Sequence, residues 1–301
     1  MTATNDNLPI AVNTFVWYSP LTDAALDRLI PRLPTWGYDA VELAYENASD
    51  WTAGHARDLL QTYGIRSVVG AVFGDGRNLT CAPDAEIETT KAYVRSAIDL
   101  AVAQGSELVI GPMYTAVGRV WKLAADERVA AYDTLRTSLT ELGDYAATRG
   151  VALAVEPLNR YETSLINTVE QLMEVIDTIP AAGVGINLDS YHMNIEEKSM
   201  SQAILDAGPR LLHMQVCGND RGAPGEDHLD WEQIRRDLAA VDYQGFLGFE
   251  SFTADNASIA TAASIWRSFA PTQDDLAIRA ADFLTTWRNG WPPLAPREGT
   301  P

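Results

Sequence analysis

Short apolar runs alternate along the whole chain with longer segments in which apolar residues recur every three or four positions. The runs favour buried strands and the longer segments favour amphipathic helices, of which 85–104 and 127–148 are the clearest. A glycine stands just past four of the helical segments, in the usual C-cap position, at Gly64, Gly105, Gly150 and Gly245. We expect strands at 10–16, 40–43, 67–72, 108–110, 152–155, 185–188, 211–216 and 246–249.

Eight strand–helix units predict one parallel (β/α)8 TIM barrel, because strands that are buried on both faces form continuous apolar runs. The competing architecture is a doubly wound open sheet. That fold carries a glycine-rich fingerprint after its first strand, whereas this chain continues there as WYSPLTD. Nothing in the sequence indicates a linker between domains. We therefore expect a single catalytic domain over 1–290 and a proline-rich surface tail over 291–301.

Oxygen-bearing side chains stand at the ends of the last four predicted strands: Glu156, Asp189, Gln215 and Glu250. The alternative for any one of these residues alone is a helix N-cap or a polar residue of a solvated loop. In a TIM barrel, however, the C-terminal strand ends meet at the active site, so the four are expected to converge. Carboxylates held that close repel one another unless a cation neutralises them. An all-oxygen ligand set suits Mn²⁺ or Mg²⁺, and also Co²⁺, better than zinc.

Further candidates for binding a substrate flank these positions. His192 follows Asp189 by three residues. His213 precedes Gln215 by two residues, so strand alternation points the side chains of His213 and Gln215 into the barrel. A core histidine is the alternative for His213. The planar guanidinium of Arg221 suits sugar or carboxylate oxygens. The alternative for Arg221 is an arginine on a surface loop. Six residues past Glu156, Glu162 could hydrogen-bond substrate hydroxyls.

The balance of charge narrows the class of partner. The formal net charge is −19, from 41 acidic and 22 basic residues, and no basic run occurs. Nucleic acid and anionic membranes are therefore poor partners. No signal peptide is visible, and no apolar stretch approaches the about 20 residues of a transmembrane helix. The two cysteines, Cys81 and Cys217, lack CxxC spacing, which is typical of reduced thiols in a cytoplasmic protein.

Four segments resemble one family of enzymes. They are EPLNRYETSLINT at 156–168, DSYHMNIEE at 189–197, RGAPGEDHLDW at 221–231 and GFLGFESF at 245–252. Together they resemble the sugar isomerase/epimerase family with a xylose-isomerase-like TIM barrel, most closely the ketose 3-epimerases that act on tagatose, psicose and ribulose. The resemblance covers the whole barrel and is weakest over the first hundred residues.

The resemblance implies roles for individual residues. Glu156, Asp189 and Glu250 would be ligands of a divalent metal. Two of them, Glu156 and Glu250, would also be the acid/base pair. The oxygens on the first three substrate carbons would be held by Glu162, His192 and Arg221. The 3-epimerases generally carry H-x-H after the seventh strand, where this chain reads His213-Met214-Gln215.

The resemblance implies that Gln215 replaces a histidine ligand and coordinates through its amide oxygen. Hydroxypyruvate isomerases of the same superfamily have a similar H-x-Q.

The expected reaction is reversible proton transfer at C3 of a free ketohexose or ketopentose, through an enediolate. One carboxylate would remove the proton and the other would deliver its own to the opposite face. The alternatives are an isomerase of hydroxypyruvate-like substrates, an aldose–ketose isomerase, and a subunit that deglycosylates C-glycosides through a 3-keto-glycoside. The last would have a small β-rich partner protein. Otherwise the resemblance implies a homodimer or homotetramer.

Overall fold

Eight parallel strands close into a barrel in chain order, with β8 hydrogen-bonded to β7 on one side and to β1 on the other. The computed structural model describes residues 8–180 and 183–290. The strands are β1 (Ile10–Asn13), β2 (Ala40–Tyr45), β3 (Arg66–Ala71), β4 (Leu108–Gly111), β5 (Ala152–Val155), β6 (Val184–Asp189), β7 (Leu211–Val216) and β8 (Phe246–Phe249). The predicted (β/α)8 barrel is confirmed, and the predicted tail at 291–301 lies outside the described residues.

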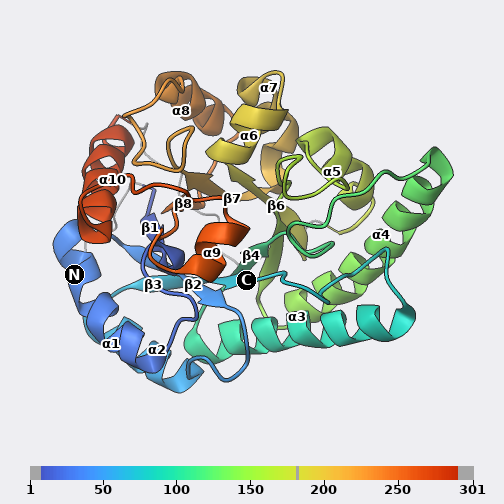
Figure 1. Cartoon of the computed structure of the whole chain (residues 1–301), viewed down its shortest axis with the longest axis horizontal. Helices are drawn as coiled ribbons and strands as arrows, with labels where there is room; N and C mark the ends of the chain where they lie inside the picture. Colours follow the sequence, from blue (N-terminus) through green and yellow to red (C-terminus); the bar gives the residue numbers. More distant parts are fainter. Residues whose placement is uncertain (1–7, 181–182, 291–301) are drawn as a thin grey trace.

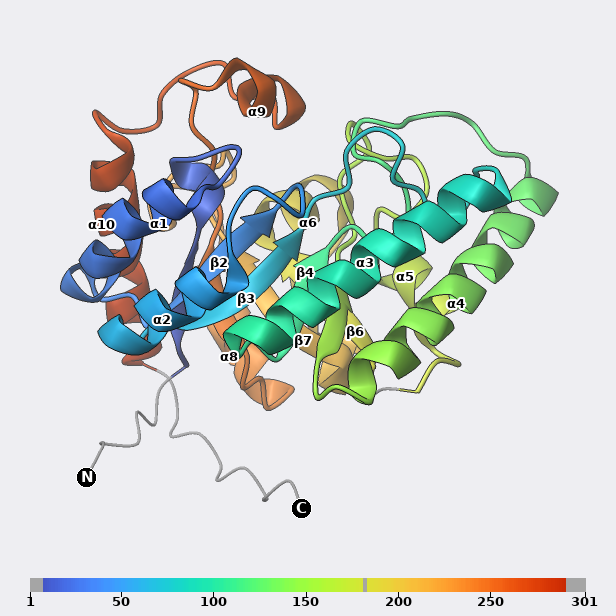
Figure 2. The same cartoon turned by 90° about the horizontal axis from the view of Figure 1, so that it is seen from below.

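Helices surround these strands (Figure 1). They are α1 (Asp23–Leu29), α2 (Ala53–Tyr63), α3 (Asp84–Gln104), α4 (Ala125–Ala147), α5 (Val169–Ile176), α6 (Ser190–Glu196), α7 (Met200–Ala207), α8 (Trp231–Ala240), α9 (Ala257–Ala262) and α10 (Gln273–Arg288), with 3₁₀ helices η1 (Thr14–Val16), η2 (Ile30–Trp36) and η3 (Gly208–Arg210). In both views α9 lies over one end of the barrel (Figure 2). Within the described ranges, no helix has the length and apolar character needed to span a membrane.

Side chains inside the barrel form layers, because successive residues of a strand point to opposite faces. Residues that face the helices, such as Val41 and Leu43, belong to the main hydrophobic core. Alternate residues form a smaller apolar cluster inside the barrel: Ala11, Ala40, Val68, Leu108, Ile110, Ala154 and Phe246. Two residues further along their strands, the interior positions become polar, as at Glu42 and Glu156. The interior thus changes from an apolar floor to a polar layer towards the strand ends.

The first strand is shorter than predicted. The expected strand at 10–16 ends at Asn13, and the next three residues form η1. The side chain of Asn13 causes this ending, because its Oδ1 accepts a hydrogen bond from the backbone N–H of Phe15 at 2.9 Å. Asparagine often competes with regular structure in this way. The helices predicted at 85–104 and 127–148 are α3 and α4, with ends shifted by one or two residues.

Gly111 closes β4 in a conformation that only glycine adopts easily. Its φ is +140°, and a Cβ built on it would stand 2.4 Å from the carbonyl oxygen of Ala71 in the neighbouring strand β3. We predict that Gly111→Ala lowers the free energy of unfolding by about 2–3 kcal/mol, because both backbone strain and a clash with fixed backbone are introduced. Urea unfolding would measure the change.

Gly54 supplies the matched control. It lies in α2 with nothing within 4 Å of a built Cβ, so Gly54→Ala should raise stability by up to about 1 kcal/mol through helix propensity. Equal effects of the two substitutions would contradict the steric explanation at Gly111.

Candidate active site

The polar layer at the strand ends gathers side chains from four consecutive strands. Along each of these strands every second residue points into the barrel, and the last such residue is polar. Because the strands are parallel, the last interior side chains of β5, β6, β7 and β8 lie at the same end of the barrel. These side chains are all less than a tenth exposed: Glu156, Asp189, Gln215 and Glu250. The alternation that fills the barrel therefore also assembles the candidate site.

Contacts with Arg221 and Gln215 connect three of the four predicted ligands, and Glu156 lies beside them. Asp189 and Glu250 both pair with Nη1 of Arg221, at 3.0 Å for Glu250 Oε2. Gln215 Nε2 donates to Glu250 Oε1 at 2.9 Å. Ligand atoms of Glu156, Asp189 and His192 all lie within 4.8 Å of one another, which is a spacing that could hold a metal ion.

Arg221 lies inside the site and not on a surface loop. It is 3% exposed, and its backbone has a φ of +74°, an uncommon value for a residue with a side chain. Its guanidinium stacks on the ring of Tyr191 with 4.1 Å to the centroid and also faces Phe252 at 5.2 Å. Strained backbone of this kind persists where surrounding contacts fix it, and it concentrates at functional sites.

His192 is oriented by the loop that follows β5. Its Nδ1 lies 3.0 Å from the backbone nitrogen of Asn159, which can only donate. Its Nε2 lies 3.6 Å from Glu156 Oε1. Burial, the largest cause, lowers the pKa of His192 and favours the neutral ring. The same Nε2 lies 3.1 Å from Nη2 of Arg221, which can only donate, so both ring nitrogens face donors and the neutral ring can accept from one of them at a time.

The remaining two predicted residues lie on different sides of the site. Glu162 lines the cavity, and its Oε1 accepts a hydrogen bond from the side chain of Asn159 at 2.8 Å. His213 is fully buried beneath the cavity, which it does not line. Its Nε2 lies 2.8 Å from Glu42 Oε1 inside the barrel. The position of His213 is that of the core histidine considered as the alternative above.

Negative charge exceeds positive charge in the buried cluster. Burial, followed by the nearby Glu250 and Asp189, raises the pKa of Glu156 well above its usual range. Burial also raises the pKa of Glu250. For Asp189, burial is outweighed by the guanidinium of Arg221 and by His192, which together lower its pKa. Three carboxylates thus face one guanidinium.

These residues fit a divalent cation. Glu156 Oε1 is buried and has no hydrogen-bond partner among the described residues. Ionising all three carboxylates would leave two uncompensated negative charges beside the guanidinium, which one divalent ion would balance. Oxygen donors of this kind suit Mg²⁺ or Mn²⁺.

The cavity above the cluster has a volume of about 380 Å³. Aromatic rings form part of its wall, from Phe15, Phe73 and Phe252, and Ile259 of α9 lies across from the strand ends. This combination of apolar walls and a few convergent polar groups is typical of small-molecule sites. Residues of α9, among them Ser258 and Ala262, line one side of the cavity, and α9 stands over one end of the barrel in Figure 2.

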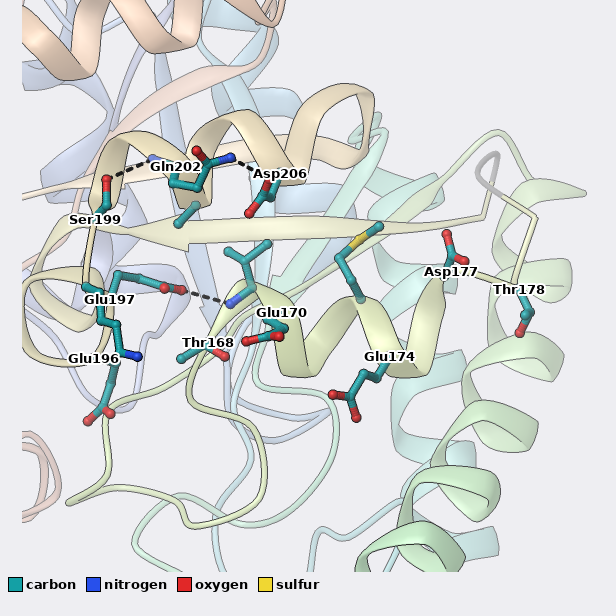
Figure 3. Close-up of a pocket in the computed structure, with 14 residues that line it drawn as sticks. Thr168, Glu170, Glu174, Asp177, Thr178, Glu196, Glu197, Ser199, Gln202 and Asp206 are labelled. Carbon is teal, nitrogen blue, oxygen red and sulfur yellow. Dashed lines mark hydrogen bonds between the residues drawn. The ribbon is translucent and has the colours of Figure 1, made fainter.

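A larger hollow, of about 790 Å³, lies outside the barrel between α5 and α7 (Figure 3). Its lining is acidic, but two of the polar side chains in it accept hydrogen bonds from backbone N–H groups at nearby helix ends. Glu197 accepts from the N–H of Val169 at 2.8 Å, and Ser199 caps α7 by accepting from Gln202. These contacts describe capped helix ends in a solvated groove, and the chemistry of the strand ends is absent from its lining.

Three buried polar residues at or below the cluster were not among the predicted site residues: Asn13, which lines the cavity, and Glu42 and Asn187, which lie beneath it. Glu42 was passed over because it stands inside an apolar run, AVELAY. A charged residue in the middle of a strand that is otherwise fully apolar was the available signal, since burying it requires partners. Asn13 carried a weaker signal, because asparagine at a strand end is usual for a turn.

The chain matches a family of TIM-barrel proteins. The model described as "Xylose isomerase-like TIM barrel" matches residues 31–285, and the chain belongs to that family.

Several relatives are ketose 3-epimerases. The L-ribulose 3-epimerase of Methylomonas sp. (strain DH-1) is 29% identical over 274 residues, which cover 90% of this chain and 95% of the relative. The D-psicose 3-epimerase of Enterocloster bolteae is 38% identical over 145 residues, covering 48% of this chain and 47% of the relative. The structure of D-allulose 3-epimerase from Methylomonas sp. in complex with D-allulose has a TM-score of 0.85 and 28% identity, covering 93% of this chain and 97% of the other.

The raised pKa of Glu156 predicts how the stability of the metal-free protein depends on pH. A folded-state pKa above the unfolded value, which is about 4.3 for glutamate, means that the native state retains a proton that the unfolded chain has released. The resulting stabilisation is full below the unfolded pKa and disappears as the pH rises through the folded one. The lowered pKa of Asp189 has the opposite sign and removes stability only in acid.

We therefore predict that the Tm of the metal-free protein falls as the pH is raised from about 5 to 8, and that Glu156→Gln makes the slope shallower. Thermal unfolding in a chelator at several pH values would measure both slopes. A Glu156→Gln slope equal to that of the parent protein would contradict the assignment to Glu156.

Proposed function

We propose that this protein is a ketose 3-epimerase acting on free ketohexoses or ketopentoses. The observation that carries the proposal is a pair of buried glutamates, Glu156 after β5 and Glu250 after β8, at one end of a single cavity. Burial raises the pKa of both, so that each carboxyl group is suited to hold a proton and to take one up. The ketose 3-epimerases among the relatives support the same reaction class.

Inversion at C3 needs a proton acceptor on one face of the substrate and a proton donor on the other. One glutamate, as carboxylate, removes the C3 proton. The electron pair of the broken C3–H bond delocalises into the neighbouring carbonyl to give an enediolate. The other glutamate, as carboxylic acid, delivers its own proton to the opposite face of C3. The two side chains exchange protonation states in each turnover, which makes the reaction reversible.

Residues around the pair can orient the sugar. The ring of His192 and the carboxylate of Glu162 line the same cavity, where they can hydrogen-bond substrate hydroxyls. Arg221 is the only lysine or arginine among the described lining residues, and Asp189 and Glu250 already engage it. A phosphate or carboxylate group would have no free cation there, which favours an uncharged sugar over a sugar phosphate or a hydroxypyruvate-like acid.

A divalent metal completes the proposed site. Glu156, Asp189 and Glu250 would hold it, and Mn²⁺, Mg²⁺ and Co²⁺ are the ions that suit such oxygens. Gln215, expected as a fourth ligand through its amide oxygen, is left out of the proposed ligand set, because Oε1 accepts from Asn187 and Nε2 faces Glu250. When bound, the ion would supply positive charge beside the carbonyl and hydroxyl oxygens of the substrate. The buried Glu156 Oε1 without a partner supports this assignment.

The reaction can be tested by proton NMR in D₂O with the Mg²⁺-loaded protein and fructose, tagatose, psicose and ribulose. We expect deuterium at C3 together with the C3 epimer. Glu156→Gln and Glu250→Gln should each lower the exchange rate at least about a hundredfold, because each removes one partner of general acid–base catalysis. Glu174→Gln, in the acidic groove outside the barrel, is the matched control and should leave the rate unchanged.

Two outcomes would contradict the proposal. Exchange only at C1 would indicate an aldose–ketose isomerase. No exchange in any of the four ketoses would exclude free ketoses of this kind and leave hydroxypyruvate-like or 3-keto-glycoside substrates.

Metal dependence has its own test. We predict that dialysis against EDTA abolishes exchange and that Mn²⁺ restores it. Thermal unfolding should show stabilisation by Mn²⁺ of about 2.7 kcal/mol at a hundredfold excess over Kd, because only the folded chain gathers the ligands. Glu156→Gln should lose most of this stabilisation. Full activity of the protein in EDTA, with no shift in Tm on adding Mn²⁺, would contradict a metal-dependent mechanism.

A further inference from the structure

Glu42 is a carboxylate in the centre of the barrel that the proposed reaction does not use. It lies on β2, is fully buried, and stands one layer below the active-site cluster. Burying a carboxylate is costly unless partners compensate for it. Every described partner of Glu42 belongs to a residue at or beneath the site: Asn13, His213 and Gln215.

Two side-chain amides connect Glu42 to Glu250. Nδ2 of Asn13 lies 3.0 Å from Glu42 Oε2 and 3.2 Å from Glu250 Oε1. Nε2 of Gln215 lies 2.9 Å from Glu42 Oε2 and 2.9 Å from Glu250 Oε1. Each NH₂ group has two hydrogens, so each can donate one to either carboxylate.

This arrangement fixes the orientation of both amides. Glu42 Oε2 accepts from the NH₂ group of each amide, so Glu42 holds the nitrogen, and not the oxygen, of Asn13 and Gln215 towards the cluster. The oxygens are turned to other donors. Asn13 Oδ1 accepts from the N–H of Phe15, and Gln215 Oε1 accepts from Asn187 at 2.7 Å. Both amides are therefore held at two ends.

The surrounding strands are shaped around Glu42. His213 Nε2 lies 2.8 Å from Glu42 Oε1 and is the basic group that faces it. A Cβ on Gly248 of β8 would stand 1.7 Å from the same oxygen, so only glycine leaves space for the pair. Three strands besides β2 thus contribute a residue to the contacts of Glu42, which is more than a chance burial would explain.

We infer that Glu42 is a positioning residue for Glu250, which it holds in place through the shared NH₂ groups of Asn13 and Gln215. Glu42 lies outside the lining of the cavity, so it acts on the substrate only through these neighbours. Its contribution to turnover rests on the proposed function, whereas its contribution to the placement of Glu250 as a metal ligand does not depend on any substrate. Outer partners of metal ligands commonly change metal affinity or activity 10–100-fold when they are removed.

The first measurement is the affinity for Mn²⁺, by titration followed through the EPR signal of the free ion. We expect Glu42→Gln, which removes the charge and keeps the shape, to raise the Kd about tenfold. Asn13→Ser is the second variant. Its hydroxyl can still accept from the Phe15 N–H, but it lacks the shared NH₂ group, so the Kd should rise in the same direction. If Glu42→Gln does not fold, Asn13→Ser decides alone.

Asp237→Asn is the matched control. Asp237 is a buried carboxylate in α8, bonded to Gln233 and remote from the strand ends, so its loss can lower the Tm but should leave the Kd for Mn²⁺ unchanged.

The second measurement is the C3 exchange rate at saturating Mn²⁺. A displaced Glu250 should lower kcat about tenfold or more with KM within about twofold, because the group that moves the proton is displaced and the groups that hold the sugar are not. A folded Glu42→Gln protein, or failing that Asn13→Ser, with parental Kd and kcat would overturn the inference. A raised Kd in a protein whose parent shows no exchange would support the positioning role of Glu42 and refute the proposed function alone.

Discussion

The shortage of buried positive charge at the mouth of the barrel governs the structure of the site. Glu156, Asp189 and Glu250 share one guanidinium, from Arg221, and burial magnifies their mutual repulsion. The surrounding contacts follow from this imbalance. Arg221 takes up an uncommon backbone conformation to reach two of the carboxylates, and Tyr191 covers the face of its guanidinium. A pocket with this excess of negative charge attracts cations and gives no free counterion to an anionic substrate, which agrees with an uncharged sugar.

The location of the site was predictable because barrel geometry and strand alternation are both visible in the sequence. An apolar run that ends in Glu156, Asp189 or Glu250 gives the strand and its active end together, and closure of the barrel then makes these ends converge. The closed order of eight parallel strands followed from the same runs. Prediction succeeded where a local sequence pattern alone determined the position of a residue. No long-range contact and no unusual backbone conformation was needed to place these residues.

Other features depended on interactions that a single sequence does not reveal. The strand expected at 10–16 stops at Asn13, because one side-chain hydrogen bond turns the backbone. Glu42 looked like an isolated charge until β7 and β8 supplied His213 and Gly248 beside it. The pairing of Arg221 with Asp189 and Glu250 needs a left-handed residue in a loop, and no local sequence signal specifies it. For Glu42 and Arg221 the missing information is a contact between residues far apart in the chain. At Asn13 it is a local side-chain hydrogen bond.

The two glutamates of the proposed reaction differ in the number of hydrogen bonds that they accept. Glu250 accepts hydrogen bonds from Asn13, Gln215 and Arg221, whereas Glu156 Oε1 has no partner among the described residues. Donors stabilise the ionised form of a carboxyl group, so a proton shared by the pair resides preferentially on Glu156. An epimerisation that begins in this state delivers the proton of Glu156 to C3 and leaves Glu250 with the proton taken from the substrate, which is the less favourable arrangement. Glu156 must therefore regain a proton and Glu250 lose one, by the reverse reaction or through solvent, before the same conversion can begin again. The polar layer under the barrel mouth thus does more than fill space, because the amides that fix Glu250 also determine in which state the pair waits for its substrate.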